Sequence, residues 1–410
     1  MLFRFDLENS FKEDNVEIVL KKDDKPESPL ECYGYNNKLN VCRNKIDNID
    51  SESWKKVRWY INVYDFQVKD PIINRAFYKY WEIINEFEIF EDYDENEIVL
   101  HCAEAPGGFI QGTNIYLQVD RMIQIPKVDN KPEITNDGFT VVKRRNRSKR
   151  FDNYRIYTIS LNKDLPQYKN YNLPSYNKNI LNKHLCITYG KDNTGDIINF
   201  ENIECIKNIS KKPFYLVTAD GGFDEGTDFN HKEQLHYQLI LNEIFSALTM
   251  QKTKGHFILK MFDILTETSV HLLYLLFLFY GEVYIYKPKT SRPTNSEKYV
   301  ICKYFKDDNE KMKSMMLNSL KELSCEISKA NSKFVSFKLF KSIPQEFVDK
   351  ISFINNSLLD KQCLHLESAI EFCNDPKFLE DYEGRLDESL ERRREVFCLW
   401  EETYNLNSYV

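Results

Sequence analysis

Short apolar runs alternate with helical patterns through the middle of the chain. Glu97–Cys102, Phe214–Ala219 and Gly255–Leu259 are mostly apolar runs with the length of a buried strand. In Ile72–Phe90 and Asn230–Gln251, apolar residues recur at the spacing of an amphipathic helix. Strands that alternate with helices predict an α/β fold, in which helices cover both faces of an open sheet. Ligands of such sheets bind at the carboxyl ends of the parallel strands.

The same pattern predicts three more strands and one buried helix. The strands are expected at Tyr154–Leu161, His184–Tyr189 and Lys298–Tyr304. Val270–Tyr280 is the longest apolar run, but it is about half as long as a membrane span and carries a histidine. We therefore expect this run to form a helix that is buried against the sheet.

Charged residues stand at the ends of these apolar strands, where burying a charge costs free energy, so that each charge there suggests a function. Asp220 follows Phe214–Ala219, and Lys260 follows Gly255–Leu259, so both belong at the ligand-binding edge. Glu297 precedes Lys298–Tyr304 and lies at the same edge if that strand is antiparallel. The pattern thus predicts a crevice with two carboxylates and one amine.

A tight turn with two glycines separates the strand at Glu97–Cys102 from the next helical pattern. Glycines let the backbone approach a ligand, and a helix N-terminus presents free N–H groups. The turn lacks both the GxGxxG spacing and the GxxxxGK[ST] phosphate loop, so it favours a small nucleoside cofactor over NAD or ATP. It consists of Ala103, Glu104, Ala105, Pro106, Gly107, Gly108 and Phe109. A second polar turn, at Asn193–Ile197, follows the expected strand at His184–Tyr189.

The two ends of the chain differ from this middle part. Residues 1–60 mix charged residues with prolines and many asparagines, which favours short strands or an irregular extension. Their Trp54, Trp59 and Tyr60 either pack the extension onto the core or form an aromatic, cationic surface that stacks a base or a cap. Residues 306–410 show helical patterns without strand-like runs. We therefore expect an extension at 1–60, a central domain at 61–305 and a helical extension at 306–410.

A basic segment interrupts the central domain. Val141–Arg155 holds seven Lys or Arg and one Asp. It is either a solvated loop or a loop that contacts phosphates, and the sequence leaves both interpretations open.

Composition narrows the possible classes of function. Of the 410 residues, 42% are hydrophobic and 29% are charged, as in soluble globular proteins. The net charge of -7 argues against indiscriminate nucleic-acid binding, although a local basic groove remains compatible with it. Ten scattered cysteines without a CxxC pair, and the lack of a signal peptide, favour a cytosolic or nuclear protein. The seven histidines show no metal-ligand spacing, so no metal is expected.

Seven motifs occur in an order that resembles one family, the FtsJ-like (RrmJ-type) RNA 2′-O-methyltransferases. The resemblance is closest to the cap-1 mRNA methyltransferases of eukaryotes and large cytoplasmic DNA viruses, and a virus or protist source agrees with the Asn-, Lys- and Ile-rich composition. It covers residues 70–305, and RRREVFCLW (392–400) resembles the segment after the catalytic domain of the cap enzymes. The motifs are NRAFYK (74–79), AEAPGGF (103–109), YTISL (157–161), TGDI (194–197), VTADGG (217–222), GHFILKMFD (255–263) and SRPTNSEKYVICK (291–303).

The resemblance implies a Rossmann-like fold, S-adenosylmethionine as cofactor and a role for each matching residue. Its catalytic Lys-Asp-Lys-Glu tetrad corresponds to Lys79, Asp220, Lys260 and Glu297. Its cofactor contacts correspond to Asn74, the turn at 103–109, Asp196, Ile197 and Asp220. Its RNA contacts suggest Asn295 and Arg292, together with Asn230 and Lys232.

Two features depart from the family pattern. The cofactor turn reads AEAPGG where the cap enzymes usually have AGPGG, so Glu104 and Ala105 make its backbone less permissive. The basic segment at 143–150 has no counterpart in the family, so any RNA role there depends on its charge alone.

In this chemistry, a ribose 2′-OH attacks a methyl group in line with its sulfur, and no metal is needed. By resemblance, Lys260 is the base or the group that orients the hydroxyl, and Glu297 can hold Lys260 in its rotamer. A free lysine has a pKa of about 10.4, so a base that works near pH 7 needs a pKa lowered by about 3 units. Burial and Lys79 would lower that pKa, whereas Asp220 and Glu297 would raise it, and the sequence does not settle the balance.

The sequence therefore predicts a methyltransferase that acts on the first transcribed nucleotide of capped mRNA, with possible partners in a capping or transcription complex. The expected location is the cytoplasm (a virus factory or virion) for a viral protein, and otherwise the nucleus. Two alternatives remain: a 2′-O-methyltransferase of internal rRNA or tRNA sites, and a non-catalytic RNA-binding scaffold subunit. The intact tetrad argues against the scaffold.

Overall fold

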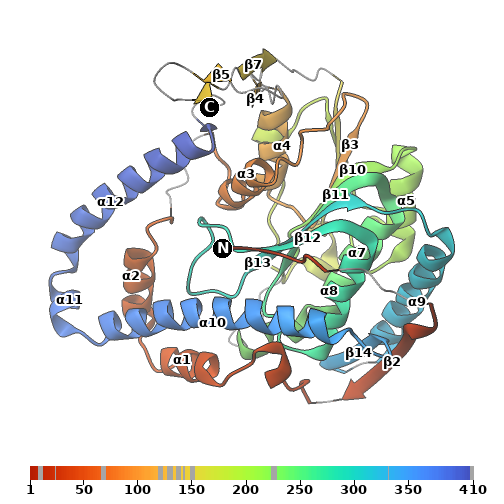
Figure 1. Cartoon of the computed structure of the whole chain (residues 1–410). Helices are drawn as coiled ribbons and strands as arrows, with labels where there is room; N and C mark the ends of the chain where they lie inside the picture. Colours follow the sequence, from red (N-terminus) through yellow and green to blue (C-terminus); the bar gives the residue numbers. More distant parts are fainter. Residues whose placement is uncertain are drawn as a thin grey trace.

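An eight-stranded mixed sheet forms the centre of the protein in the computed structural model (Figure 1). The structure describes residues 1–7, 13–23, 25–65, 71–118, 153–222, 229–330 and 332–406, and the backbone of four short strands between 123 and 147. In spatial order the sheet contains β1 (Leu2–Arg4), β12 (Tyr280–Tyr286), β13 (Lys298–Phe305), β11 (Gln251–Met261), β10 (Phe214–Ala219), β3 (Ile98–Cys102), β8 (Arg155–Ile159) and β9 (Leu185–Thr188).

The last five of these strands are parallel to one another, so their carboxyl ends meet at one edge. β13 is antiparallel to β11, with Lys260 opposite Tyr299, and its first residue therefore lies at that same edge. This arrangement confirms the expected α/β fold and the antiparallel orientation on which the placement of Glu297 depended. β11 continues through Lys260 to Met261 instead of ending at Leu259.

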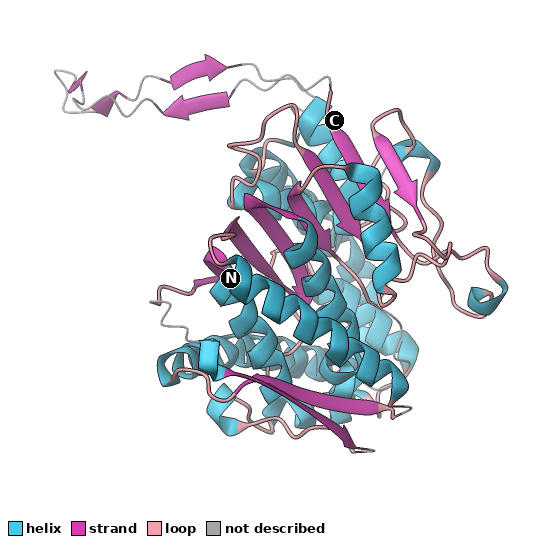
Figure 2. Ribbon diagram, turned by 90° about the vertical axis from the view of Figure 1, so that its right-hand side faces the viewer, coloured by secondary structure: helices cyan, strands magenta, loops and turns pink. Residues whose placement is uncertain are grey.

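Helices cover both faces of the sheet because successive strand residues point to opposite sides. Val217 and Leu259 pack on one face, and their neighbours Leu216 and Ile258 pack on the other. The first face carries α5 (Phe200–Ser210), α7 (Tyr237–Met250) and α8 (Glu267–Phe279). The second carries α3 (Ala76–Glu86) and α4 (Gly108–Gln118) (Figure 1). Figure 2 shows helices in front of and behind the central strands.

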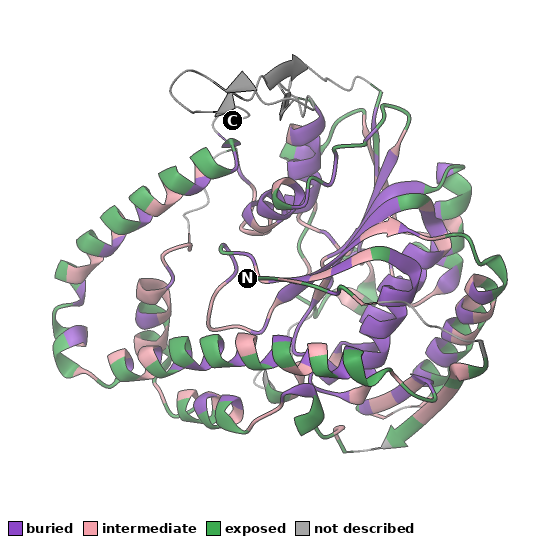
Figure 3. Cartoon of the chain, in the orientation of Figure 1, coloured by how far each residue is buried: buried purple, intermediate pink, exposed green. Residues whose placement is uncertain are grey.

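The expected helix at Val270–Tyr280 is confirmed as α8, which is buried from Thr268 to Phe279 (Figure 3). In the part of the chain that the structure describes, no helix combines the length and the apolar character that crossing a bilayer requires. The expected single helix at Asn230–Gln251 is interrupted at His236, which separates α6 (Lys232–Leu235) from α7.

The two ends of the chain pack together, and both differ from the sequence prediction. Residues 1–60 hold two helices that were not predicted, α1 (Lys38–Ile46) and α2 (Ser51–Ile61), which pack against α10 (Gln345–Cys373). Residues 306–410 include a strand, β14 (Phe334–Phe340), which pairs with β2 (Val16–Asp23). Each of these strands acquires its partner from the other end of the chain, so local pattern alone does not reveal them. The three-domain division stays a prediction.

The remaining helices continue from the sheet to the C-terminus. They are α9 (Glu310–Lys329), α11 (Pro376–Glu380) and α12 (Tyr382–Thr403). Most of α12 is exposed, but its end returns to the sheet, where Trp400 is buried in the same cluster as α3 (Figure 3).

The aromatic residues of α2 pack mainly against these C-terminal helices. The Tyr60 ring lies 4.9 Å from that of Phe378, and the guanidinium of Arg393 lies 3.6 Å from the Trp59 ring. Trp59 and Tyr60 therefore have a packing role, but their partners belong to helices α10, α11 and α12 and not to the sheet that was expected. Trp54 also borders a pocket.

The basic segment falls largely outside the described residues. β4 (Ile123–Pro126) pairs with β7 (Arg144–Arg147), and β5 (Glu133–Ile134) pairs with β6 (Thr140–Val141). The choice between a solvated and a phosphate-contacting loop at 143–150 stays a prediction.

Candidate active site

Four charged side chains from four elements converge at the carboxyl edge of the sheet. Lys79 lies in α3, Asp220 follows β10, Lys260 lies in β11, and Glu297 precedes β13. The Lys260 Nζ atom lies 3.3 Å from Asp220 Oδ1 and donates a hydrogen bond of 2.7 Å to the Asp220 carbonyl oxygen. The Lys79 Nζ atom lies 2.8 Å from Glu297 Oε1. The predicted convergence is therefore present, with an amine–carboxylate pair on each side.

This pairing corrects the expectation that Glu297 holds Lys260 in its rotamer. Glu297 holds Lys79, whereas Lys260 is held by Asp220. Glu297 acts on Lys260 only through its charge. The side chains in these two pairs are between 11% and 15% exposed, so water screens them little.

Electrostatics keeps both Lys260 and Glu297 charged, although they belong to different pairs. Burial lowers the pKa of Lys260, but Asp220, Glu297 and Glu243 raise it more, so that the net shift is upward. Burial raises the pKa of Glu297, but Lys79, Lys260 and Lys287 outweigh burial and lower this pKa to about 2. In this structure Lys260 is thus an ammonium group near neutral pH.

Three further residues belong to the site and were not predicted from the sequence. The buried Tyr299 hydroxyl donates to Asp220 Oδ1 at 2.9 Å. The buried Glu243 accepts the Gly221 N–H at 3.2 Å, and burial raises the pKa of Glu243 to about 8. Lys287 Nζ donates to the Glu297 carbonyl oxygen at 2.7 Å. Tyr299 follows Glu297 by two positions, which was a usable signal, but nothing in the sequence pointed to Glu243 on α7.

The turn after β3 forms a close-fitting cradle. Gly107 has a φ of 114°, and a Cβ atom on Gly108 would overlap the Asn74 side chain. Asn74 is thereby placed against the turn, as expected. Glu104 is buried, and its Oε1 atom accepts the Phe109 N–H at 2.8 Å, so the departure from the family pattern caps the first turn of α4.

The second polar turn lies beside this cradle. Ser160 Oγ accepts the Ala105 N–H at 3.1 Å, and Asn162 N–H donates to the Thr194 carbonyl oxygen at 2.8 Å. Asp196 comes next in this turn, and burial raises its pKa. Hydrogen bonds thus link the turns at 103–109 and 193–197 through the segment after β8, while Ile197 is buried in the core.

The cradle has a buried oxygen without a partner, which bears on its fit to a nucleoside cofactor. The Glu104 Oε2 atom is buried and has no hydrogen-bond partner. Burial and the nearby Asp220 raise the pKa of Glu104 well above its usual value. An unpaired buried oxygen beside a glycine turn fits a ligand that supplies a hydrogen-bond donor or a positive charge. Among the described residues, no group of three or more His, Cys, Asp or Glu side chains could hold a metal ion.

All four predicted RNA-contact residues line one pocket of about 320 Å³ beside Glu297. Asn230 and Lys232 border it from one side, and Arg292 and Asn295 from the segment before β13. The Asn295 carboxamide oxygen already accepts a hydrogen bond from Lys287 at 2.5 Å. The pocket is also lined by Arg43, Asp47, Trp54, Arg58 and Phe262, of which all but Phe262 come from α1, α2 and the loop between them.

Comparison with known proteins agrees with this geometry. The sequence profile of the family described as FtsJ-like methyltransferase matches residues 72–305, more than half of the chain. The chain belongs to the FtsJ-like methyltransferase family. The matched segment begins just before Asn74 and ends with β13, so it contains the cradle and both amine–carboxylate pairs.

The similar curated proteins are much longer than this chain. Cap-specific mRNA (nucleoside-2′-O-)-methyltransferase 1 of Mus musculus is 32% identical over 222 residues, which is 52% of this chain and 25% of that protein. The corresponding methyltransferase 2 of Pongo abelii is 29% identical over 288 residues, 66% of this chain and 33% of that protein. The chain thus spans a quarter to a third of these relatives. A solved Plasmodium falciparum ribosomal RNA methyltransferase is 18% identical with a TM-score of 0.36, covering 57% of this chain and 97% of that chain.

Replacing Tyr299 with Phe is expected to lower the turnover rate roughly 10-fold while the protein stays folded. The substitution removes only the hydroxyl that donates to Asp220, and a hydrogen bond to a charged group contributes about 1.5–3 kcal/mol. Single-turnover methyl transfer measures the effect. Tyr280→Phe is the matched control, because it removes an equally buried hydrogen bond, to Gln251, away from the site. Equal rates in both variants would show that the Tyr299 hydroxyl does not act on the reaction.

Proposed function

We propose that this protein transfers a methyl group from S-adenosylmethionine to the ribose 2′-OH of the first transcribed nucleotide of a capped mRNA. The pocket of about 320 Å³ beside Glu297 is called the cationic pocket below. The observation that carries the proposal is the position of the Lys260–Asp220 and Lys79–Glu297 pairs between the glycine cradle and this pocket. Membership of the methyltransferase family supports the reaction. The names of the curated relatives support the capped substrate.

The cradle supplies the groups that would hold the cofactor. Asn74, the backbone of residues 103–109 and the Asp196 turn surround the position, and Glu104 offers its unpaired oxygen. S-adenosylmethionine supplies an electrophilic methyl group on a positively charged sulfur. The carboxylate of Asp220 favours a positive charge at this place, which helps to fix its position.

Lys260 orients the acceptor in this mechanism and does not remove its proton. Because carboxylates keep Lys260 protonated, its ammonium group donates to the hydroxyl oxygen of the ribose. As the oxygen–methyl bond forms and the methyl–sulfur bond breaks, the hydroxyl proton passes to solvent water. The ammonium groups of Lys260 and Lys79 stabilise the negative charge that develops on the oxygen. Asp220 and Glu297 hold these two amines at fixed positions, so little reorganisation is needed during the reaction.

The cationic pocket supports a substrate with a highly charged 5′ end. Four basic residues, Arg43, Arg58, Lys232 and Arg292, line this pocket together with the carboxylates of Asp47 and Glu297. Arg292 also forms an ion pair with Asp65, which pairs with Arg75 as well. Burial lowers the pKa of Arg58, the charges of Arg292 and Arg75 lower it further, and Asp65 raises it. Surplus positive charge of this kind fits the phosphates of a cap bridge, and Trp54 offers a ring on which a base can stack.

The decisive experiment measures labelled methyl transfer to three RNAs: a short RNA with an N7-methylguanosine cap, the same RNA with a 5′ triphosphate, and a structured rRNA fragment. Product nucleosides are then mapped. Labelling of the first ribose only in the capped RNA is expected. Equal labelling of capped and uncapped RNA, or labelling of the rRNA alone, would favour the internal-site alternative. No transfer to any RNA by a folded, cofactor-binding protein would favour the scaffold alternative. We further propose a cytoplasmic or nuclear location, which fractionation of source cells would test.

Arg58→Ala is expected to weaken the binding of capped RNA roughly 10-fold and to leave turnover at saturating RNA nearly unchanged. Removing one phosphate contact should also reduce the slope of log K against log[salt] by about 0.7. Lys55→Ala is the matched control, because Lys55 lies on the same helix, pairs only with the exposed Glu52 and does not line the pocket. An unchanged salt slope in Arg58→Ala would contradict the phosphate contact.

A further inference from the structure

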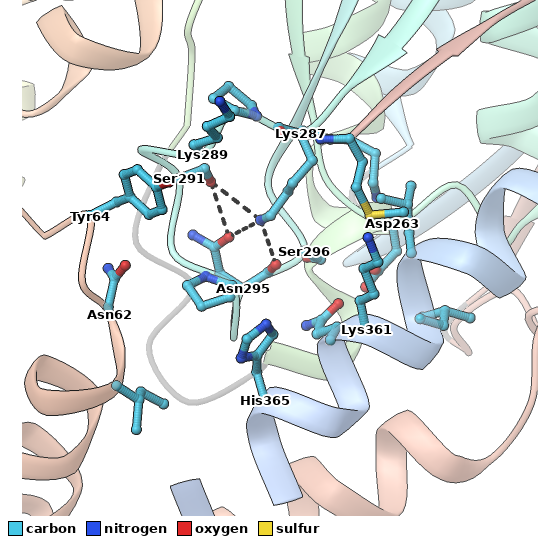
Figure 4. Close-up of a pocket in the computed structure, with 18 of the residues that line it drawn as sticks. Asn62, Tyr64, Asp263, Lys287, Lys289, Ser291, Asn295, Ser296, Lys361 and His365 are labelled. Atoms are coloured by element: carbon cyan, nitrogen blue, oxygen red, sulfur yellow. Dashed lines mark hydrogen bonds between the residues drawn. The ribbon is translucent and has the colours of Figure 1, made fainter. Parts of the chain in front are cut away.

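A second pocket, of about 250 Å³, adjoins the cationic pocket beside the active site. The two share Asn295, Ser296 and Gln362 as lining residues. We call the second one the α10 pocket, because α10 forms one of its walls. The end of α2 with the following residues, including Asn62 and Tyr64, forms another wall, and the segment from Lys287 to Lys298 lies between them (Figure 4).

Positive charge dominates the α10 pocket. Its lining holds five amines, those of Met1, Lys287, Lys289, Lys298 and Lys361, against one carboxylate, that of Asp263. That carboxylate is already bound by Arg43 at 2.8 Å, outside the pocket lining. The surplus of cations favours an anionic ligand.

Most of these amines are held by the protein, and two are not. The Met1 amine donates to the Lys287 carbonyl oxygen at 2.8 Å, and Lys298 donates to the Phe262 carbonyl oxygen. Lys287 donates to oxygens of its own segment. Lys289 and Lys361 are exposed, and their side-chain amines make no hydrogen bond or ion pair within the described part of the chain, although the Lys289 backbone N–H donates to Glu82 Oε1 at 2.7 Å. These two ammonium groups are available for a phosphate.

The remaining lining favours a flat, partly polar group beside that phosphate. Tyr64, Leu358 and Leu359 provide aromatic and aliphatic surface. Asn62 is only 2% exposed, and its Nδ2 atom has no hydrogen-bond partner. An inorganic phosphate would leave the apolar wall uncovered, and a fatty carboxylate would leave the Asn62 amide unsatisfied. A heterocyclic base with acceptor atoms satisfies both.

We propose that the α10 pocket binds one nucleotide unit, with its phosphate at Lys361 and its base between Tyr64 and α10. The unit comes either from a free nucleoside monophosphate or from the RNA chain that occupies the adjoining cationic pocket. Binding of a free nucleotide is independent of the proposed function, whereas binding of an RNA nucleotide rests on it. The two sources are separated by the experiment below.

Occupancy of the pocket acts on the active site through Lys287. Its Nζ atom donates to the Asn295 carbonyl oxygen at 2.8 Å and to the Ser291 hydroxyl at 3.3 Å (Figure 4). It also donates to the Glu297 carbonyl oxygen at 2.7 Å. Burial lowers the pKa of Lys287 to about 7. Lys298 and Lys79 also lower this pKa, whereas Glu297 and Asp263 raise it. A phosphate nearby favours the charged form of Lys287 and so strengthens these bonds to the segment that carries Glu297.

The test is calorimetric titration of the full chain with GMP, AMP, guanosine and inorganic phosphate, and with capped RNAs of one and four nucleotides. We expect GMP or AMP to bind at least 10-fold more tightly than guanosine or phosphate, or the four-nucleotide RNA to bind at least 10-fold more tightly than the one-nucleotide RNA. Lys361→Glu should abolish whichever preference is seen. This variant changes an exposed side chain, so the fold is expected to persist.

Lys350→Glu is the matched control, because Lys350 lies on the same helix and does not line either pocket. Loss of monophosphate binding in Lys361→Glu alone identifies a free nucleotide as the ligand, and loss of the RNA length preference alone identifies the transcript. The proposal is overturned if neither ligand is affected by Lys361→Glu. It is also overturned if Arg58→Ala abolishes nucleotide binding while Lys361→Glu does not. Because binding is measured without methyl transfer, these outcomes do not depend on whether the capped RNA is methylated.

Discussion

Lys260→Ala is expected to reduce methyl transfer roughly 10³-fold, within the range of about 10²–10⁴ found for positioned proton-transfer and orienting groups. The ammonium group of Lys260 lies next to Asp220 at the carboxyl edge of the sheet, where the ribose hydroxyl must be oriented. Cofactor binding should stay nearly normal, because Lys260 is separate from the turn at 103–109. Single-turnover kinetics and titration with S-adenosylmethionine measure the two effects separately.

The matched control is Lys252→Ala. Lys252 lies on the same strand, β11, but its ion pair is with Glu97 and not with any of the four site residues. Its rate should stay within about 2-fold of the unmodified protein, since the ion pair that is lost involves Glu97 and none of the four site residues. Near-normal turnover by Lys260→Ala would remove Lys260 from the mechanism.

The pH dependence of the reaction distinguishes an orienting Lys260 from a basic one. The pKa of Lys260 is raised, so Lys260 stays protonated between about pH 7 and 9. If it only orients the hydroxyl, its titration should not make the rate increase in this range. A base would instead give a rate that increases with pH until Lys260 is deprotonated. A rate that increases through this range in the unmodified protein, and not in Lys260→Arg, would contradict the orienting role.

Gly107→Val is expected to weaken the binding of S-adenosylmethionine by at least about 10-fold and to lower stability. Gly107 has a φ of 114°, and a Cβ atom there would overlap the Ile180 side chain. Left-handed backbone costs a β-branched residue roughly 1–2 kcal/mol, and a shift of the turn would misplace its N–H groups. Isothermal titration with the cofactor and thermal unfolding measure the two changes.

Gly384→Ala is the control for this substitution. Gly384 lies in α12, where the added methyl group meets only the end of the Asp381 side chain. Alanine is favoured over glycine in a helix by about 1 kcal/mol, so this variant should be slightly more stable and should bind the cofactor normally. Normal cofactor affinity in Gly107→Val would show that the turn does not hold the cofactor.

Much of the fold was predictable because its signals are local. The strands at 97–102 and 214–219 are continuous apolar runs, and both are central in the sheet. The buried helix α8 was recognisable because it is apolar on all sides. Strand β14 and helices α1 and α2 were missed, because β14 depends on pairing with β2 and the two helices depend on packing against α10.

The candidate site, like the fold, was only partly predictable from the sequence. The four charged residues could be identified because each lies at a strand end or in a motif whose residue types stand together in the sequence. The pairs that they form could not, because Lys79 and Glu297 are separated by 218 positions and meet only through the packing of α3 against the sheet. Glu243, on a helix with no distinguishing pattern, becomes part of the site only because α7 places it beside Gly221.

By itself, the sequence determined the α/β class, the positions of the central strands along the chain, the glycine turn and the identities of the four charged residues, since these follow from local patterns and motifs. Only the tertiary structure decided which carboxylate holds which amine, and therefore that the pKa of Lys260 is raised. It also decided that residues from both ends of the chain build the two pockets beside Glu297. The physical reason is that charge interactions and pockets depend on distances of a few ångströms between segments far apart in the chain, and packing alone sets these distances.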